Sequence, residues 1–532
     1  MSPCRGGLFL FGGGMAGRLP AGRGFRMTGG QAGGRMPDGK LYIKLQFVHQ
    51  LEGPCSMIFH SPEFLVFLLA LLVPFYLFKK LRIPLLVVAN AIFYGASGFG
   101  LLLLFMAVTA ATFLCALGLR RRRPLFWIGL AVNAGNLLFF KYTLMIMDTA
   151  ERIAGRPLLL TELARQWVTD GSGELILPVG ISFYTFQLIA YLIDVRRGDL
   201  EPSRNLFKFW VFISVFPQLI AGPIMRGSEL IPQVDRLPDR AVRWGEIRYG
   251  LYLIFVGLIK KTVFADNLET LVNPRFADIP ALTPEDAWVA ACLFGFQIYF
   301  DFSAYSDMAL GLGHLLGLKL VVNFRTPYLS GSPKEFWDRW HISLSRWIRD
   351  YVYIGLGGNR KGALRTQFNL LAAMLISGLW HGAAWHFVAW GAVHGLILIV
   401  HRWTLALNRF GWVNKMRSSF PYRVLAVAVF FPIVTWTWVF FRAETLAGAW
   451  EMTKRMAQVD VTALAAHPLF ALLAGLYALH IAEWFMREKE PLAGRIWHFV
   501  PAVFRGAVYA ALLLLIFFNM KGETYEFIYF QF

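Results

Sequence analysis

Charged residues are scarce in this sequence. They make up 16% of the 532 residues, whereas 57% are hydrophobic. Soluble globular domains are about 25% charged. Several stretches of about 17–25 residues carry few or no charges, which is the length that crosses the hydrocarbon core of a bilayer. The composition therefore excludes a soluble enzyme, a secreted disulfide scaffold and a disordered chain, and it predicts a polytopic membrane protein.

Cysteines and acidic residues are also few. The four cysteines (Cys4, Cys55, Cys115 and Cys292) show no CxxC spacing and no disulfide framework. With 33 acidic against 52 basic residues, the formal net charge is +19. We assign this excess to cytoplasmic loops and to contact with anionic lipid. Nucleic acid is not an expected partner, because no basic block forms a recognition module.

Apolar segments predict an all-α protein with about 11–13 membrane helices, some of them short enough to be re-entrant or interfacial. Basic clusters after the first, third and fifth segments place those ends in the cytoplasm. The absence of a visible internal repeat weakens a transporter interpretation. The candidate spans lie near residues 63–78, 84–97, 99–118, 125–146, 175–194, 205–222, 247–265, 286–303, 366–382, 384–401, 424–441, 463–484 and 503–519.

Residues 1–56 differ in composition from the remainder of the chain. They contain 14 glycines, seven basic and two acidic residues, and no apolar segment typical of a signal peptide. Such a segment buries too little apolar surface to fold. We predict a disordered extension before a single domain at 57–532. Either the biological start is Met57, or the extension is a genuine basic arm.

Histidine is the informative residue type. Six of the 11 histidines lie within residues 314–401. His381 stands in a stretch, 366–401, without any charged residue, and small residues flank it. A buried imidazole is held neutral, and a neutral imidazole can accept a proton from a hydroxyl group. His381 is therefore a candidate general base. The alternative is a histidine that is hydrogen-bonded to a neighbouring helix.

A second histidine, His341, falls in an amphipathic pattern. We predict one continuous aromatic-rich interfacial helix there. His341 would lie on its polar side, with Asp338 one turn before it to orient the imidazole. The alternative is a helix at the lipid headgroups with His341 merely solvated. The apolar stripe is Phe336, Trp340, Leu344, Trp347 and Tyr351, and the polar stripe is Asp338, His341, Ser345 and Arg349.

Metal binding is not expected. No histidine pair has i,i+4 spacing and no HExxH motif occurs. His394 and His401 share a helix face, but no carboxylate accompanies them. We interpret His386 and His394 as residues that line a tunnel or pack helices together.

Three further features carry polar groups. Asp301, at the end of a predicted span, either lines a polar cavity or takes part in helix–helix hydrogen bonds with tyrosine and serine. A glycine-rich turn with Asn359 and Arg360 either holds phosphates through backbone N–H groups and nearby cations or contacts lipid headgroups. The last residues, with Tyr529, either anchor in the membrane interface or present a phenol to a site.

Several of these motifs together resemble the membrane-bound O-acyltransferase family, in its bacterial branch with alginate O-acetylase and the teichoic-acid D-alanylation protein. One departure is Gly355, where the family usually has proline. The resemblance covers about 57–532, because the motifs occur in the family's order along that range. They are Phe-Trp-Asp-Arg-Trp-His-Ile-Ser-Leu-Ser at 336–345, Gly-Gly-Asn-Arg at 357–360, Leu-Trp-His-Gly at 379–382, and the segments 178–187, 216–224, 301–307 and 527–532.

The resemblance implies a ring of helices around a central funnel and a metal-free acyl transfer. His381 corresponds to the family's essential histidine and His341 to its second one. Trp340, Trp380, Asp338, Asn359, Arg360 and Asp301 are the expected supporting residues. The partner of the D-alanylation system ends in a similar Phe-Ile-Tyr motif, which makes Tyr529 a candidate acyl carrier.

The predicted function is transfer of an acetyl group from a cytoplasmic thioester, such as acetyl-CoA, for O-acetylation of an exported polysaccharide. Alginate or a similar exopolysaccharide is the expected acceptor, and cellulose, peptidoglycan and teichoic acid are alternatives. No bound cofactor is expected. The resemblance implies periplasmic acetyl-handling partners and a multi-pass location in the inner membrane. A polysaccharide or lipid-linked-sugar transporter and a glycosyltransferase are the alternatives from other classes.

Overall fold

The computed structural model describes residues 57–169, 176–241, 243–488, 497, 499–520 and 527–528. The extension predicted at 1–56 and the candidate carrier Tyr529 therefore lie outside the described residues. Within them the secondary structure is helical, without a strand, which confirms the predicted all-α class.

The first half of the described chain runs to the end of a long helix, α13. Its helices are α1 (Pro62–Leu77), α2 (Arg82–Gly95), α3 (Phe99–Gly118), α4 (Pro124–Leu137), α5 (Thr143–Ala154), α6 (Leu159–Val168), α7 (Ile181–Arg197), α8 (Leu206–Ser214), α9 (Phe216–Leu219), α10 (Gly227–Asp235), α11 (Trp244–Ile259), α12 (Asp266–Ala277) and α13 (Pro284–Leu315). Two π-helical turns, η2 (Leu138–Tyr142) and η3 (Lys260–Ala265), join α4 to α5 and α11 to α12.

The second half contains the helices that carry the clustered histidines. They are α14 (Pro333–Arg339), α15 (Ile342–Trp347), α16 (Ala363–His381), α17 (Trp385–Leu405), α18 (Gly411–Arg417), α19 (Phe420–Arg442), α20 (Leu446–Met456), α21 (Val461–Ala465), α22 (Phe470–Glu488) and α24 (Ala502–Asn519). A third π-helical turn, η6 (Ile348–Tyr353), follows α15. Short 3-10 turns are η1 (Lys79–Leu81), η4 (Ile279–Ala281), η5 (Pro327–Leu329) and η7 (Ala406–Arg409).

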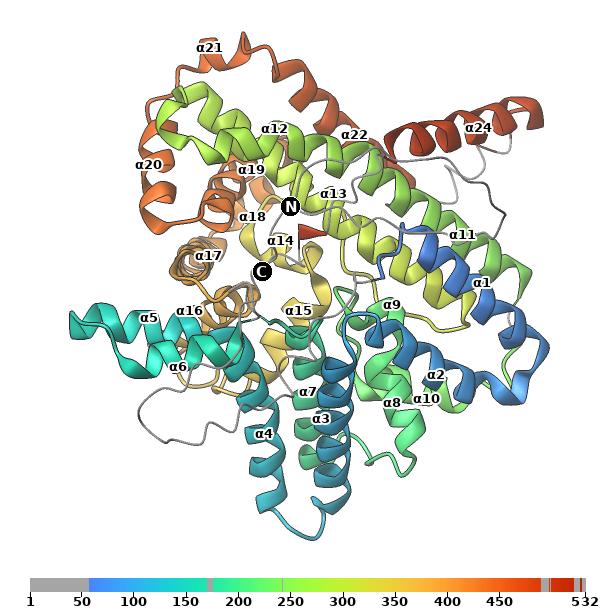
Figure 1. Ribbon diagram of the computed structural model, residues 1–532. Helices are drawn as coiled ribbons and strands as arrows, with labels where there is room; N and C mark the ends of the chain where they lie inside the picture. Colours follow the sequence, from blue (N-terminus) through green and yellow to red (C-terminus); the bar gives the residue numbers. More distant parts are fainter. Residues whose placement is uncertain are drawn as a thin grey trace, which may run out of the picture. The chain divides into compact units, whose positions relative to one another are not determined.

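Helix α13 is the core helix of the described domain, and α11 and α12 pack against it (Figure 1). It has 32 residues, most of them buried, and its start is fixed by Thr283, whose side chain accepts a hydrogen bond from the Asp286 N–H. At 1.5 Å per residue it is about 48 Å long, which exceeds the hydrocarbon thickness of a bilayer. Gly250 of α11 faces Gly311 of α13 so closely that a Cβ on Gly250 would lie 2.7 Å from the Gly311 carbonyl oxygen. Glycine at both positions lets the two backbones approach.

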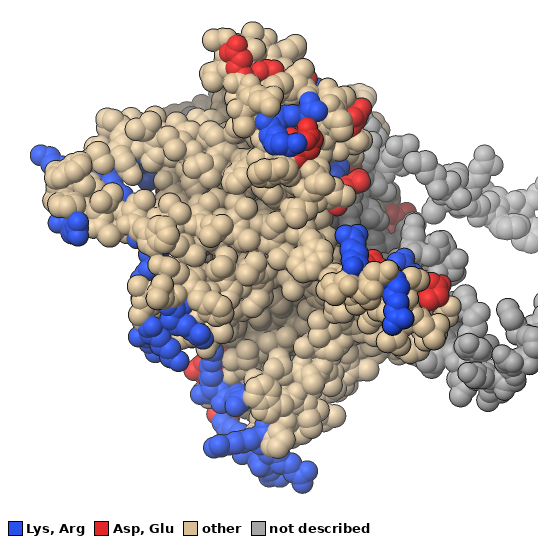
Figure 2. Space-filling view, turned by 90° about the vertical axis from the view of Figure 1, so that its left-hand side faces the viewer, with Lys and Arg blue, Asp and Glu red and all other residues tan. Residues whose placement is uncertain are grey.

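Six helical segments are long and apolar enough to cross a membrane, among the residues that the structure describes. They are Phe99–Gly118, Pro124–Ala154, Pro284–Leu315, Trp385–Arg409, Phe420–Arg442 and Ala502–Asn519. Figure 2 shows a face with a broad area free of charged residues, with Lys and Arg gathered at its margins. These features confirm a multi-pass membrane protein, and the number of crossings stays a prediction.

Some predicted spans are interrupted. The span at 205–222 is divided into α8 and α9 at Val215. The spans at 125–146 and 247–265 each contain a π-helical turn, η2 or η3. Hydropathy cannot detect such interruptions, because they change hydrogen bonding and leave the apolar composition unchanged.

Candidate functional site

His381 is the last residue of α16 and is 3% exposed. The helix ends there because Gly382 takes an extended backbone conformation, and a Cβ at Gly382 would clash with the Phe387 ring. Gly378, one turn earlier, lies directly against the backbone of α17 at Phe387. The small residues that flank His381 therefore allow a break in the helix and a close contact between helices.

His341 lies at a sharp break between α14 and α15, and it is 0% exposed. Its φ of 41° and ψ of 56° are left-handed, a strained conformation for a residue with a Cβ. Asn323 stabilises the break, because its carbonyl accepts the Ile342 N–H and its side chain accepts the Ser343 N–H. The predicted single helix over these residues is therefore wrong. Periodicity does not detect two non-helical residues, Trp340 and His341, within an otherwise amphipathic sequence.

The break also changes the position of Asp338. Its carboxylate pairs with Lys334 at 2.8 Å, and its side chain is 61% exposed. His341 is buried on the other side of the break, so the prediction that Asp338 orients the imidazole is wrong. Trp340 turns into the core, 1% exposed, with its ring 4.8 Å from that of Trp438.

The structure brings His341 and His381 together. Their ring centroids are 6.4 Å apart, and the Trp380 ring lies 5.6 Å from His341 and 5.0 Å from His381. Further rings beside the pair include Phe302 at 4.7 Å from His341, and Trp390 at 5.0 Å and Phe441 at 5.2 Å from His381. Two imidazoles within aromatic walls form a site from which water is largely excluded, which favours group transfer over hydrolysis.

Lys141 is a residue of this site that sequence reasoning missed. It lies in η2, is 5% exposed, and its Nζ donates to the carbonyl oxygens of Trp380 and His381 at 2.8 and 3.1 Å. The next residue, Tyr142, donates its hydroxyl to the Leu379 carbonyl at 2.7 Å. Lys141 is the one charged residue between 124 and 147. A lone charge inside an apolar segment is a signal that points to it.

Asp301 of α13 forms a second buried polar centre. One of its carboxylate oxygens accepts from Lys261 Nζ at 2.8 Å, and the other accepts from the Ile528 backbone N–H at 2.8 Å. Lys261 also pairs with Asp266 at 2.9 Å and lies 4.5 Å from the Phe527 ring centroid. Asp301 thus joins α13 to η3 through an ion pair with Lys261, where the sequence interpretation expected hydrogen bonds with tyrosine and serine, and it also binds the C-terminal residues.

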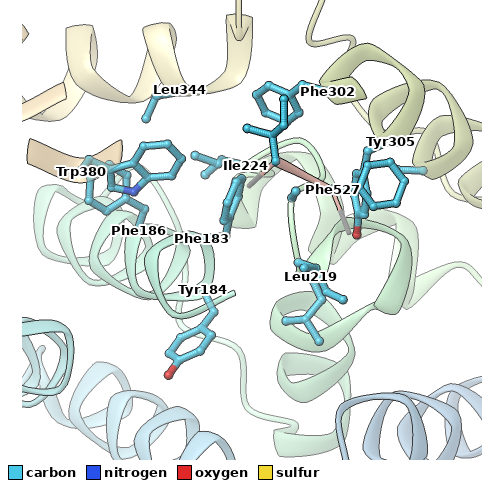
Figure 3. Close-up of a cluster of buried hydrophobic side chains, with 14 of the residues drawn as sticks. Phe183, Tyr184, Phe186, Leu219, Ile224, Phe302, Tyr305, Leu344, Trp380 and Phe527 are labelled. Atoms are coloured by element: carbon cyan, nitrogen blue, oxygen red, sulfur yellow. The ribbon is translucent and has the colours of Figure 1, made fainter. Parts of the chain in front are cut away.

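Phe527 and Ile528 are 1% and 5% exposed, so this C-terminal pair is part of the core. Figure 3 shows Phe527 beside Tyr305, in one cluster with Phe302, Phe183 and Trp380. Phe302 and Trp380 are also neighbours of the two histidines. The C-terminal residues therefore enter the same aromatic cluster that encloses the histidine pair.

The remaining predicted residues lie elsewhere. Asn359 and Arg360 are exposed on the glycine-rich turn before α16. His386 Nδ1 lies 3.0 Å from the Phe440 carbonyl oxygen, and His394 Nε2 lies 3.0 Å from Thr437 Oγ1, so both join α17 to α19. Within the described ranges, no group of three histidine, cysteine or acidic side chains is placed to hold a metal ion.

Comparison with known proteins gives concordant results. Residues 201–443, which include His341 and His381, match the model of the membrane-bound O-acyltransferase family. The chain is 38% identical over 414 residues to the probable alginate O-acetylase of Pseudomonas aeruginosa, covering 75% of each chain. It is 35% identical over 419 residues to the peptidoglycan O-acetyltransferase of Helicobacter pylori, covering 73% of this chain and 75% of the relative.

A more distant match is the teichoic acid D-alanyltransferase of Bacillus subtilis. It is 27% identical over 287 residues, which are 51% of this chain and 70% of the relative. These proteins are named for acetyl or D-alanyl transfer, so the shared chemistry is movement of an acyl group.

Proposed function

Because this chain belongs to the membrane-bound O-acyltransferase family and is an acyltransferase, we propose that it O-acetylates an exported polysaccharide, with alginate or a similar exopolysaccharide as the acceptor. The observation that carries the proposal is the buried pair of His341 and His381 within the family-matched region. The transporter and glycosyltransferase alternatives find no support in the relatives named above.

His381 is the general base in this proposal. Its neutral imidazole accepts the proton of an attacking hydroxyl group while the oxygen bonds to the thioester carbonyl carbon. The carbon–sulfur bond then breaks, and the imidazolium returns the proton to the departing thiolate. His341 orients the substrates or stabilises the charge that develops on the carbonyl oxygen. Support comes from the shared aromatic enclosure of the two rings.

Tyr529 is the proposed acyl carrier. Its phenol is the hydroxyl group whose proton His381 accepts, and as the phenol oxygen bonds to the carbonyl carbon the carbon–sulfur bond breaks and the thiol leaves. A hydroxyl group delivered from the periplasmic side then attacks the tyrosine ester, takes the acetyl group and returns a proton to the phenol oxygen. Support comes from the C-terminal motif and from Phe527 and Ile528, which precede Tyr529 and are held in the core by Asp301 and Lys261. The position of Tyr529 itself lies outside the described residues.

Tyr529→Phe removes a single oxygen atom and, with it, the proposed nucleophile. We expect the acetyl content of the polysaccharide to fall to background, because no phenol oxygen remains to accept the acetyl group from the thioester. Membranes that contain matched amounts of each variant are compared by O-acetyl analysis. Tyr422→Phe, in the first turn of α19, is the control because it removes a phenol oxygen from a tyrosine outside the proposed site. Normal acetylation in Tyr529→Phe would refute the carrier role.

The donor, partners and location complete the proposal. We propose acetyl-CoA or another acyl thioester as the cytoplasmic donor, with no bound cofactor, and the inner membrane as the location. The exposed turn with Asn359 and Arg360 is the proposed contact for the donor phosphates, because it combines backbone N–H groups with cations. Periplasmic acetyl-handling proteins are the proposed partners.

The acceptor is tested by complementation. We expect the chain to restore O-acetyl groups in an alginate-producing strain that lacks its own acetylase, when the periplasmic proteins of that strain are present. Peptidoglycan is the second acceptor to examine, because a peptidoglycan O-acetyltransferase is 35% identical to this chain. Acetylation of peptidoglycan alone, with unmodified alginate, would replace the proposed acceptor.

A further inference from the structure

The end of α16 presents a problem of hydrogen bonding. The last four carbonyl groups of an α-helix have no partner within the helix. Here the helix ends at His381, which is 3% exposed, so bulk water does not reach these carbonyls freely. A buried carbonyl without a donor costs free energy, and it also leaves the last turn free to fray. The last turn of α16 is the turn that carries His381.

Lys141 and Tyr142 supply the missing donors. A lysine ammonium has three N–H donors. Lys141 Nζ has three acceptors within hydrogen-bonding distance, the Trp380 carbonyl, the His381 carbonyl and, at 3.2 Å, Ser182 Oγ. The Tyr142 hydroxyl binds the Leu379 carbonyl. The carbonyls of three successive residues, 379 to 381, are therefore each bound by η2.

The Lys141 amine is also placed to act on the helix when it is protonated. A cation at a helix C-terminus stabilises the partial negative charge of the unpaired carbonyls. Among the described residues, no carboxylate forms an ion pair with Lys141. A basic side chain that is buried within a candidate membrane span without a carboxylate partner is costly and is characteristic of a functional group.

We infer that Lys141 and its neighbour Tyr142 are positioning residues for His381, which they hold through the backbone carbonyls of residues 379 to 381. The inference rests on the proposed role of His381. Lys141 fixes the last turn of α16, so the imidazole keeps one position relative to His341 and the reacting carbonyl. A displacement of the base by about 1 Å can slow a reaction by about 100-fold.

Lys141→Met keeps the length of the side chain and removes the charge and the donors. We expect kcat to fall by about 10- to 100-fold, while KM for acetyl-CoA stays within about threefold, because the base is displaced and the donor site is not. Tyr142→Phe removes one hydrogen bond, and we expect a two- to tenfold fall in kcat. Initial rates are measured in membranes of the alginate-producing strain, with acetyl-CoA as the donor.

Thr143→Val is the matched control. Thr143 follows in the same segment, and its hydroxyl binds carbonyls of its own helical turn, Leu138 and Phe139. We expect its kcat to equal that of the parent chain. Rates are divided by the amount of folded protein, determined by size-exclusion chromatography of the full chain in detergent.

The outcomes separate the two proposals. If folded Lys141→Met has the kcat of the parent, or if kcat and KM both change by the same factor, the positioning role is refuted. If Lys141→Met does not fold, an unchanged kcat in Tyr142→Phe refutes it instead. If His381→Ala keeps its activity, the proposed base is wrong, whatever the Lys141 variants do.

Discussion

His381→Ala is expected to abolish acetyl transfer. A positioned base contributes about 10²- to 10⁴-fold to a rate, so the residual O-acetyl content should be at or near the background of cells without the protein. The measurement is the O-acetyl content of the secreted polysaccharide, with membrane levels of the variants matched. The substitution removes an imidazole that is almost fully buried, so the variant protein must also be shown to fold and reach the membrane.

His401→Ala is the control for this experiment. His401 belongs to the same cluster of six histidines in the sequence, but it lies on α17 and is only half-buried. We expect its acetylation to equal that of the parent. Normal acetylation by His381→Ala at matched membrane levels would show that another group accepts the proton.

Asp301→Ala is expected to have the largest effect on folding. It removes one of the carboxylate partners of Lys261, which is 1% exposed, and it removes the acceptor of the Ile528 N–H. Removal of one partner from a buried ion pair costs about 3–5 kcal/mol. We expect a fall of several degrees in the melting temperature of the purified full chain, together with loss of acetylation as the C-terminal residues detach.

Asp338→Ala provides the contrast. Asp338 and Lys334 form an exposed pair, and such pairs contribute about 0–1 kcal/mol. We expect its melting temperature and acetylation to match those of the parent. Equal destabilisation by the two substitutions would mean that the buried network around Asp301 is not the stabilising element that its contacts indicate.

The burial of His381 could be predicted from the sequence because the features that indicate it lie next to His381 in the chain. An uncharged stretch and flanking glycines are visible without knowledge of any other helix. The position of His341 depended on one backbone break, and the stabilising Asn323 lies outside the motif that contains His341. Its burial could therefore not be derived from periodicity.

Buried polar networks are the second kind of feature that sequence reasoning missed. In the sequence, the polar stripe of a helix has the same pattern whether it faces water or a polar group of another helix. Lys261 and Asp301 belong to different helical segments, and only the packing of η3 against α13 shows that they meet. Lys141 could have been noticed as an isolated charge, but its partners are backbone carbonyls, which no sequence motif records.

The π-helical turns have a consequence for how this protein tolerates insertions and deletions. In an α-helix, consecutive side chains point about 100° apart, so two consecutive residues seldom contact the same neighbouring element. In η2, Lys141 and Tyr142 both reach the end of α16, and in η3, Lys260 and Lys261 both reach carboxylates of α13. A π-helical turn is an α-helix with one extra residue. Loss of a single codon there would restore regular helix and rotate one half of the segment against the other. Each pair of neighbouring residues would then lose its common target, although every side chain in the pair was still encoded.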